Sequence, residues 1–533
     1  MKRCSKIAVL LIALMVGTLA NCGRDERAIS QSEWEKLIGI RGEAREICRL
    51  ETQREFLKRS KSGTESQIVE LTGQLEPRVA DILSTANLRL LQKIEDSYPP
   101  DTEDERKVRR LRHYLISLRI EKATEAPREY LSEMRGAAKF SVGGRHVNIE
   151  GLMEILSTAR DRDLRQEAYV AWHSELQKEN AVIESKIVIE DSVAVDLGYG
   201  DFTSLKQEAQ QIDYARLTEQ ANDVLARTDS LARDLAATVV PQLAGLKADR
   251  LRGYDIAFLM STTSFDSYFS SETWMEGEGE ILAGLGDGFE ANWQSMIVHS
   301  PSRTERPGTF AISIPDDVRI VAPDNAGLWA ASAQLHELGH ALFYRNTTER
   351  EFEFTQLGEG ALKEAFAFSL EGLYDEAGFV TTKVGIPEQQ LSNYLRQRAY
   401  LQLELLRSYC ADFLFEQEAY AGAPNLRQVY EDIAERVSGY DWNDVDREMM
   451  FRRLEGFASA EYLAGWFLAA QIREYLFEQF GDGWYESHEA GAFLKGLWQN
   501  GTRKPALEIA GMIGDSTIAP DALLRQLTAA AGR

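Results

Sequence analysis

The chain has 533 residues, enough for one large folded unit or two to three lobes, and its 44% hydrophobic and 9% aromatic residues are typical of a globular protein rather than a disordered one. The formal net charge is −24, from 60 basic and 84 acidic residues. Such an acidic surface argues against nucleic acid as a partner, because phosphate contacts need clustered lysine and arginine. It favours solubility and some attraction for cationic peptides.

The first residues are predicted to be an export signal rather than part of the fold. "MKRCSKIAVLLIALMVGTLANCG" has a basic start, an apolar run over 7–20 and small residues before Cys22. The run is too short to span a bilayer, as in a cleaved signal. "LANC" resembles a bacterial lipobox, which predicts a signal peptide over 1–21 and a lipid on Cys22. Asn21 departs from the small residue usual before that cysteine, and "TLA" also fits ordinary signal cleavage.

An exported bacterial protein of this kind would be periplasmic. Its one expected contact with a membrane is a lipid anchor at Cys22. Cys48 and Cys410 are the other cysteines beyond the signal, too few and too scattered for a disulfide framework. They are predicted to be buried thiols in helices.

Helical periodicity dominates the chain from about residue 30 onward. Residues 30–137 predict consecutive amphipathic helices, and "KFSVGGRHVNIEG" after them predicts a hairpin around its two glycines. Helices resume over 152–251, and the glycine-rich stretch 273–293 predicts a loop. Strands are expected only over 309–314 and 318–321. The rest again predicts helices, so the fold class is mainly α with one small sheet.

"QLHELGHALF", residues 334–343, is the most specific motif and directly follows the predicted strands. Its surroundings favour one long helix, in which His336 and His340 lie one turn apart on the same face. Two neutral imidazoles at this spacing suit a zinc ion, and Glu337 beside them can accept a proton from the attacking water. Chance gives HExxH in roughly one chain of this length in a hundred. The alternative is therefore a helix without metal, in which both histidines form hydrogen bonds within the protein.

A glutamate further along completes the predicted ligand set. The helical run 354–374 offers Glu359, Glu364 and Glu371, of which the first and last lie beside glycine near the ends of the run. Glu364 lies among the apolar residues 365–368, where a carboxylate is costly unless it is paired or binds a metal. We therefore expect Glu364 to be the third ligand of one Zn²⁺, with a fourth position open for water. A glutamate on the helix surface is the alternative.

With these residues in place, the sequence resembles the angiotensin-converting-enzyme-type zinc peptidases, with the thimet oligopeptidases as more distant relatives. In the former, the glutamate ligand follows the second motif histidine by 24 positions, which here is Glu364. "LMEILSTARDRDLRQEAYVAWH" (152–173), "VHSPS" (298–302) and the segment 485–524 are also similar to stretches of that family. The resemblance runs from about residue 150 to the end, and its pieces keep their order.

The resemblance implies a helical ellipsoid divided by a deep cleft, with zinc at the bottom. Residues 22–149 would then cap the cleft, and residues 150–533 would form the catalytic region. It implies a zinc metallopeptidase, either an oligopeptidase or a peptidyl-dipeptidase-like enzyme, that acts on short peptides. The metal ligands would be His336, His340 and Glu364, with Glu337 as the general base.

Further residues are implied by the same resemblance. Tyr462 in "EYLAGWFLAAQIREYL" matches the tyrosine that stabilises the tetrahedral oxyanion, and His299 in "VHSPS" matches a histidine that contacts the peptide backbone. Arg452 stands where the family has its second catalytic histidine, and arginine can donate hydrogen bonds but cannot shuttle a proton near neutrality. An aromatic side chain in the core and a structural histidine are the alternatives for Tyr462 and His299.

Other positions depart from the family pattern. Met450 and Ser459 replace the lysine and tyrosine that hold a substrate's C-terminal carboxylate, so release of C-terminal dipeptides is not supported. Glu461 replaces the arginine of a chloride site, which makes chloride activation doubtful. Phe368 replaces the aspartate that orients a histidine ligand, so another group has to orient it.

Three hypotheses follow from these observations. The first is an exported zinc peptidase for short peptides. The second is a zinc- or peptide-binding lipoprotein with weak or no catalysis, motivated by the replacements at Arg452, Met450 and Phe368. The third, a helical scaffold without metal, requires the two histidines and two glutamates to coincide by chance. The intact Glu337 favours the first hypothesis, because a protein without catalysis has no need of a base.

Overall fold

The computed structural model describes residues 29–286, 289, 293–300, 307–323, 326–438, 443–449 and 454–532. Most of the described chain is helical, and its strands form two small sheets, so the predicted mainly α fold is confirmed. The predicted signal, with Cys22, and the positions Met450 and Arg452 lie outside the described residues. No helix within these ranges combines the length and the apolarity that crossing a membrane requires.

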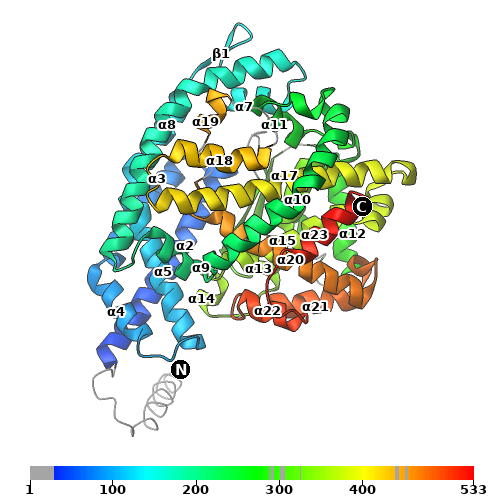
Figure 1. Ribbon diagram of the computed structural model, residues 1–533. Helices are drawn as coiled ribbons and strands as arrows, with labels where there is room; N and C mark the ends of the chain where they lie inside the picture. The colour runs from blue at the N-terminus through cyan, green and yellow to red at the C-terminus, as the bar shows by residue number, and fades with distance from the viewer. Residues whose placement is uncertain are drawn as a thin grey trace.

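The predicted N-terminal helices form one flank of the molecule (Figure 1). They are α2 (Gln31–Arg59), α3 (Glu65–Ile82), α4 (Thr85–Glu95), α5 (Glu103–Ala123) and α6 (Glu125–Ala137). The first of them begins with a capping box, in which the Ser30 hydroxyl accepts from the backbone N–H of Glu33 and the Glu33 carboxylate accepts from that of Ser30. From Leu37 to Leu50 its buried residues recur every three or four positions, so one face packs inward.

Next in the chain is the predicted hairpin, β1 (Phe140–Val142) and β2 (Arg145–Val147), joined by Gly143 and Gly144. Both glycines have positive φ, as a two-residue hairpin turn requires. The helices that follow are α7 (Ile149–Thr158), α8 (Arg162–Asp196), α9 (Phe202–Gln210), α10 (Tyr214–Ala244), α11 (Gly253–Ser261) and α12 (Ser271–Gly284).

The loop predicted over 273–293 is wrong for its first half, because α12 occupies Ser271–Gly284. Glycine lowers intrinsic helix propensity, but burial of an apolar face can outweigh it. In α12, Trp274, Ile281 and Leu282 are buried in the main core and supply that face.

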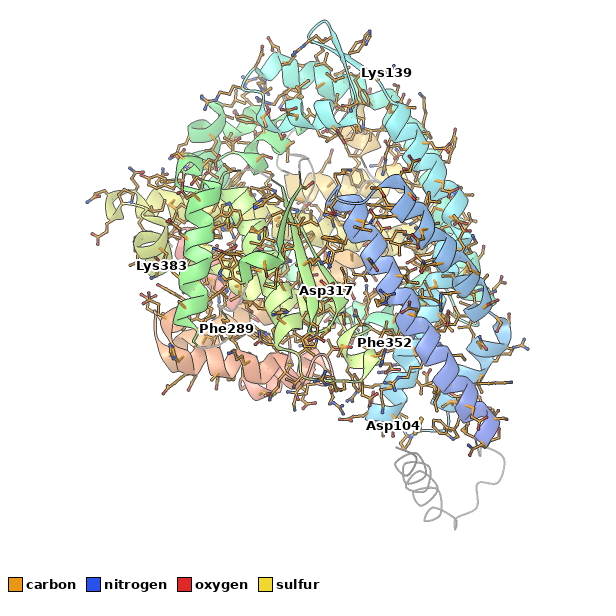
Figure 2. All side chains as sticks on the ribbon, turned by 180° about the vertical axis from the view of Figure 1, so that it is seen from behind. Asp104, Lys139, Phe289, Asp317, Phe352 and Lys383 are labelled. Carbon is orange, nitrogen blue, oxygen red and sulfur yellow. The ribbon has the colours of Figure 1, made fainter. Side chains whose placement is uncertain are left out.

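A small sheet precedes the motif helix, as predicted, and it has a third strand besides the two expected. Its strands β3 (Ile297–Ser300), β4 (Gly308–Ser313) and β5 (Asp317–Pro323) have the order β3-β5-β4, with β3 parallel and β4 antiparallel to β5. One face, with Phe310 and Ile312, packs on Phe56 of α2. The other face contributes Ala311 and Ile320 to the main core, next to the motif helix. Figure 2 shows the strands between these helices, with Asp317 at the start of β5.

The remaining helices follow this sheet in the chain. They are α13 (Leu328–Asn346), α14 (Phe352–Thr355), α15 (Gly360–Glu371), α16 (Ala377–Phe379), α17 (Glu388–Tyr420), α18 (Leu426–Ser438), α19 (Asp444–Glu448), α20 (Ala458–Phe480), α21 (His488–Trp498), α22 (Ala506–Met512) and α23 (Asp521–Ala530). In the middle of the molecule α15 packs against α13 on one side and α20 on the other (Figure 1).

The N-terminal and C-terminal helices share a single main core. That buried cluster extends from Leu37 on α2 to Leu527 on α23. Arg110 of α5 also donates a 3.2 Å hydrogen bond to Glu359, the residue before α15. The predicted boundary between a cap over 22–149 and a catalytic region over 150–533 stays a prediction, and so does the deep cleft.

Candidate metal centre

Two glycines let three helix backbones approach closely around Glu364. A Cβ atom added at Gly339, inside the HELGH motif of α13, would lie 2.6 Å from the Cα atom of Ala367 on α15. A Cβ atom added at Gly465 on α20 would lie 2.6 Å from the Cβ atom of Glu364. Neither position has room for a side chain, so α15 is held between its neighbours and its carboxylate is brought to the histidines of α13.

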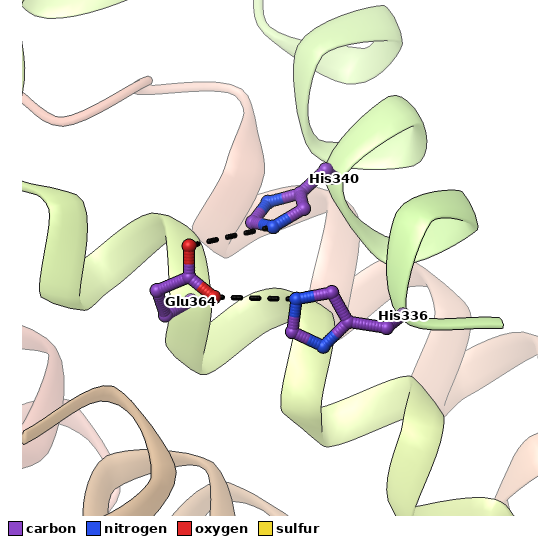
Figure 3. Close-up of side chains that lie close together, drawn as sticks. All are labelled: His336, His340 and Glu364. Carbon is purple, nitrogen blue, oxygen red and sulfur yellow. Dashed lines mark ion pairs between the residues drawn. The ribbon is translucent and has the colours of Figure 1, made fainter. Parts of the chain in front are cut away.

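The three predicted ligands point toward one another (Figure 3). His336 Nε2 lies 3.2 Å from Glu364 Oε2, and His340 Nε2 lies 3.6 Å from Glu364 Oε1. One ligand atom from each residue lies within 4.8 Å of the others. Ligands about 2.0–2.1 Å from a tetrahedral ion are about 3.3 Å apart. The group therefore has the spacing to hold one metal ion.

The contact between His336 and Glu364 supports this interpretation. Their atoms are close, but Glu364 Oε2 is buried and has no hydrogen-bond partner among the described residues, because the 3.2 Å approach lacks hydrogen-bond geometry. An unsatisfied buried acceptor costs about 1–3 kcal/mol, and more if it is charged. The same arrangement is typical of two ligands of one metal ion, whose atoms lie close together but point at the ion rather than at each other. The residues present therefore fit a bound cation.

The two carboxylates beside His336 favour its protonated form. Burial works to lower the pKa of His336, but Glu364 and Glu371 outweigh it and raise that pKa well above its ordinary value. Burial works to raise the pKa of Glu364, and the two histidines outweigh it and lower that pKa. Burial lowers the pKa of His340. A metal ion would compete with the proton of His336, because histidine binds a metal in its neutral form.

Glu371 is a site residue that the sequence did not predict in its observed role. Its Oε2 atom lies 3.2 Å from Nδ1 of His336, the ring nitrogen that points away from Glu364. The spacing of seven positions from Glu364 places both carboxylates on one face of α15, and this was the signal available in the sequence. Phe368 lies between them, with its ring centroid 4.7 Å from that of His336. Phe368, which stands where the family has its orienting aspartate, thus packs on the ring of His336.

Glu337 and Tyr462 are both held beside the ligands. The backbone oxygen of Glu337 accepts a 2.8 Å hydrogen bond from the hydroxyl of Thr309, which ties α13 to strand β4. The Tyr462 ring lies 6.5 Å from that of Phe368 and stacks on Tyr409 at 5.0 Å. Burial, followed by the nearby carboxylates, raises the pKa of Tyr462, so its phenol keeps its proton at neutral pH.

His299 is placed on the sheet, and no contact joins it to the three ligands. It lies on β3 opposite Ala322 of β5, and its side chain is exposed. Arg452, the fourth residue implied by the resemblance, lies outside the described residues. Both roles stay predictions.

The other carboxylates near the ligands are held by contacts within the protein. Glu359, an alternative third ligand in the sequence, accepts hydrogen bonds from Arg110 and from the backbone N–H of Ala506. Glu461 lies over the first residue of α15, since a Cβ atom added at Gly360 would meet its carboxylate at 2.3 Å. Because this is the N-terminus of α15, the positive end of the helix dipole stabilises the Glu461 carboxylate.

Substituting Gly339 with alanine is expected to lower the free energy of unfolding by about 1–3 kcal/mol, because the new methyl group has to push the backbones of α13 and α15 apart. Gly465→Ala should act in the same way against α20. Gly496→Ala is the matched control, since a Cβ atom there meets nothing within 4 Å inside α21. Chemical denaturation would measure all three variants. Equal stability of Gly339→Ala and the control would contradict the close packing.

Comparison with known proteins does not assign the chain to a family. A scan against models of protein families gives no match to the sequence, and a search of curated proteins gives none either. The resemblance to converting-enzyme-type peptidases therefore rests on the motifs quoted above and stays a prediction.

Proposed function

We propose that the protein is an exported zinc-dependent peptidase that hydrolyses short peptides. His336, His340 and Glu364 would hold one zinc ion, and Glu337 would act as the general base. The observation that carries the proposal is the convergence of the three ligands, in which Glu364 Oε2 lies 3.2 Å from His336 Nε2 without a hydrogen bond. The resemblance of the motifs supports the same conclusion.

Zinc is proposed over other divalent ions because of the ligand types. Two imidazoles and one carboxylate suit zinc, whereas calcium and magnesium prefer sets made of oxygen. Three protein ligands would leave a coordination position open, as in catalytic rather than structural zinc sites. When bound, a zinc ion polarises a carbonyl group and makes water a stronger nucleophile at neutral pH.

The residues beside the ligands supply the remaining chemistry. Glu337, which follows His336 in the helix, would accept a proton from the attacking water and pass it to the leaving amine. The protonated phenol of Tyr462 would donate a hydrogen bond to the oxyanion as charge develops. Arg452 would act as a second donor in place of the family's histidine.

The small sheet offers a surface for an extended peptide. Among the described strands, β3 and β4 each pair only with β5, so both are edge strands. An extended peptide can add to such an edge through backbone hydrogen bonds. His299 on β3 would then contact the peptide backbone. The net charge of −24 favours peptides with basic residues over acidic ones.

A zinc- or peptide-binding lipoprotein without appreciable catalysis is the second candidate. It is favoured by the replacements at Arg452, Met450 and Phe368, and Ser459 likewise departs from the family pattern. In the structure Ser459 donates a 2.7 Å hydrogen bond to the buried Glu416, so this side chain has a role inside the fold. The geometry of the three ligands supports both candidates, and only catalysis separates them.

Cleavage of a mixed peptide library tests the proposal. Protein from residue 23 onward would be incubated with peptides of which half have blocked C-termini, and the products would be read by mass spectrometry. We expect cleavage that a chelator stops and added zinc restores. Blocked peptides should be cut as well, because the residues that would hold a free C-terminal carboxylate are replaced. Absence of cleavage by the zinc-loaded protein would overturn the peptidase and favour the second candidate.

A further inference from the structure

A connected series of charged groups, each at most 15% exposed, lies behind His336 on the side away from Glu364. His336 Nδ1 lies 3.2 Å from Glu371 Oε2. The other oxygen of Glu371 accepts a 3.1 Å hydrogen bond from the guanidinium of Arg398 on α17. Arg398 also donates to Asp375 at 2.8 Å. The imidazole is therefore linked to a second helix through one carboxylate.

This network is fixed at several points. Arg398, whose side chain is 4% exposed, also donates a 2.9 Å hydrogen bond to the hydroxyl of Ser332, one turn before His336 on α13. The second oxygen of Asp375 accepts from Gln402 and from Arg473 on α20. The guanidinium is thus held by Ser332 and Asp375, and it in turn holds Glu371. A carboxylate held in this way has little freedom to turn away from the imidazole.

We propose that Glu371 is the positioning residue of His336. It accepts the proton on Nδ1, which fixes the tautomer in which Nε2 presents its lone pair to the metal, and Arg398 keeps the carboxylate in place. This inference rests on the proposed metal centre. It also explains why an apolar residue, Phe368, can stand where the family has its orienting aspartate. The orienting carboxylate is instead that of Glu371, three positions further along α15.

The test is the affinity of zinc for metal-free protein, measured by competition with a chromophoric chelator. Glu371→Gln keeps the shape and one acceptor but loses the charge, and Glu371→Ala loses both. Removal of such outer partners typically weakens metal binding about 10–100-fold, so we expect the glutamine variant near the lower value and the alanine variant near the higher. Glu376→Gln is the matched control, because this buried carboxylate bonds to Trp484 and makes no contact with either histidine.

The unfolding temperature of each metal-free variant separates positioning from a merely structural role. A structural ion pair would lower that temperature and leave the zinc dissociation constant within about twofold of the unmodified protein. That result would overturn the inference and leave the metal centre intact. Failure of the unmodified protein to bind zinc would instead overturn the proposed function, and the inference with it.

A structure of the zinc-loaded, unmodified protein provides a test without any variant. The inference expects Nε2 of His336 on the ion and Nδ1 within hydrogen-bond distance of Glu371. Coordination through Nδ1, or Glu371 as a ligand in place of Glu364, would overturn it. Both outcomes leave the presence of a metal centre intact, so they differ from a failure of the proposed function.

Discussion

Glu337→Gln is expected to lower peptide hydrolysis by about 10²–10⁴-fold while zinc stays bound, because the substitution removes the proton acceptor and none of the three ligands. Glutamine has nearly the same shape, so the backbone contact of Glu337 with Thr309 can persist. The effect should fall on the turnover number. Initial rates on a fluorogenic peptide, with metal content measured on the same samples, provide both quantities.

Glu404→Gln is the matched control for this variant. Burial raises the pKa of Glu404 on α17 to about 7, so this side chain is another buried carboxyl group whose removal tests the general cost of such a change. It should leave the turnover number nearly unchanged. A Glu337→Gln protein that keeps full activity would remove Glu337 from the mechanism, and one that loses its zinc would make it part of the metal site.

Glu364→Gln is expected to weaken zinc binding by more than about 100-fold, beyond the range typical of outer partners, because it replaces a charged ligand by a neutral amide. The change also removes one of the two carboxylates that raise the pKa of His336. Activity should disappear at zinc concentrations that saturate the unmodified protein. Equilibrium dialysis followed by elemental analysis measures the bound metal.

Glu359→Gln serves as the control for the third ligand. The two glutamates lie in the same segment of the sequence, but Glu359 is bonded to Arg110 and to the backbone of Ala506. We expect this variant to lose stability and to keep its zinc. The assignment of Glu364 would be contradicted if the two variants bound zinc equally well.

The sequence was informative where function depends on local spacing. One helical turn separates His336 from His340, so a single face of a helix was enough to predict that they meet. The apolar neighbours of Glu364 predicted that its carboxylate needs a partner, and two histidines lie beside it in the structure. The glycine pair 143–144 likewise predicted a hairpin that needs only local geometry.

Features that depend on contacts between distant segments could not be predicted from the sequence. Nothing in its pattern tells that Gly465 faces Glu364, or that Arg398 reaches Glu371 across 27 positions of chain. The helix α12 was missed because its glycines oppose helix formation locally, whereas Trp274 and Leu282 are buried by tertiary packing. The partner of His336 could have been suspected from the helix face shared by Glu364 and Glu371.

Titration of metal-free protein with zinc, with peptide hydrolysis measured at each step, tests the central claim most directly. A one-zinc peptidase predicts that activity rises with added zinc and reaches a plateau at one ion per chain. Glu364→Gln should show no such rise over the same range. Activity that does not depend on zinc, or one tightly bound zinc per chain with no hydrolysis, would contradict the claim.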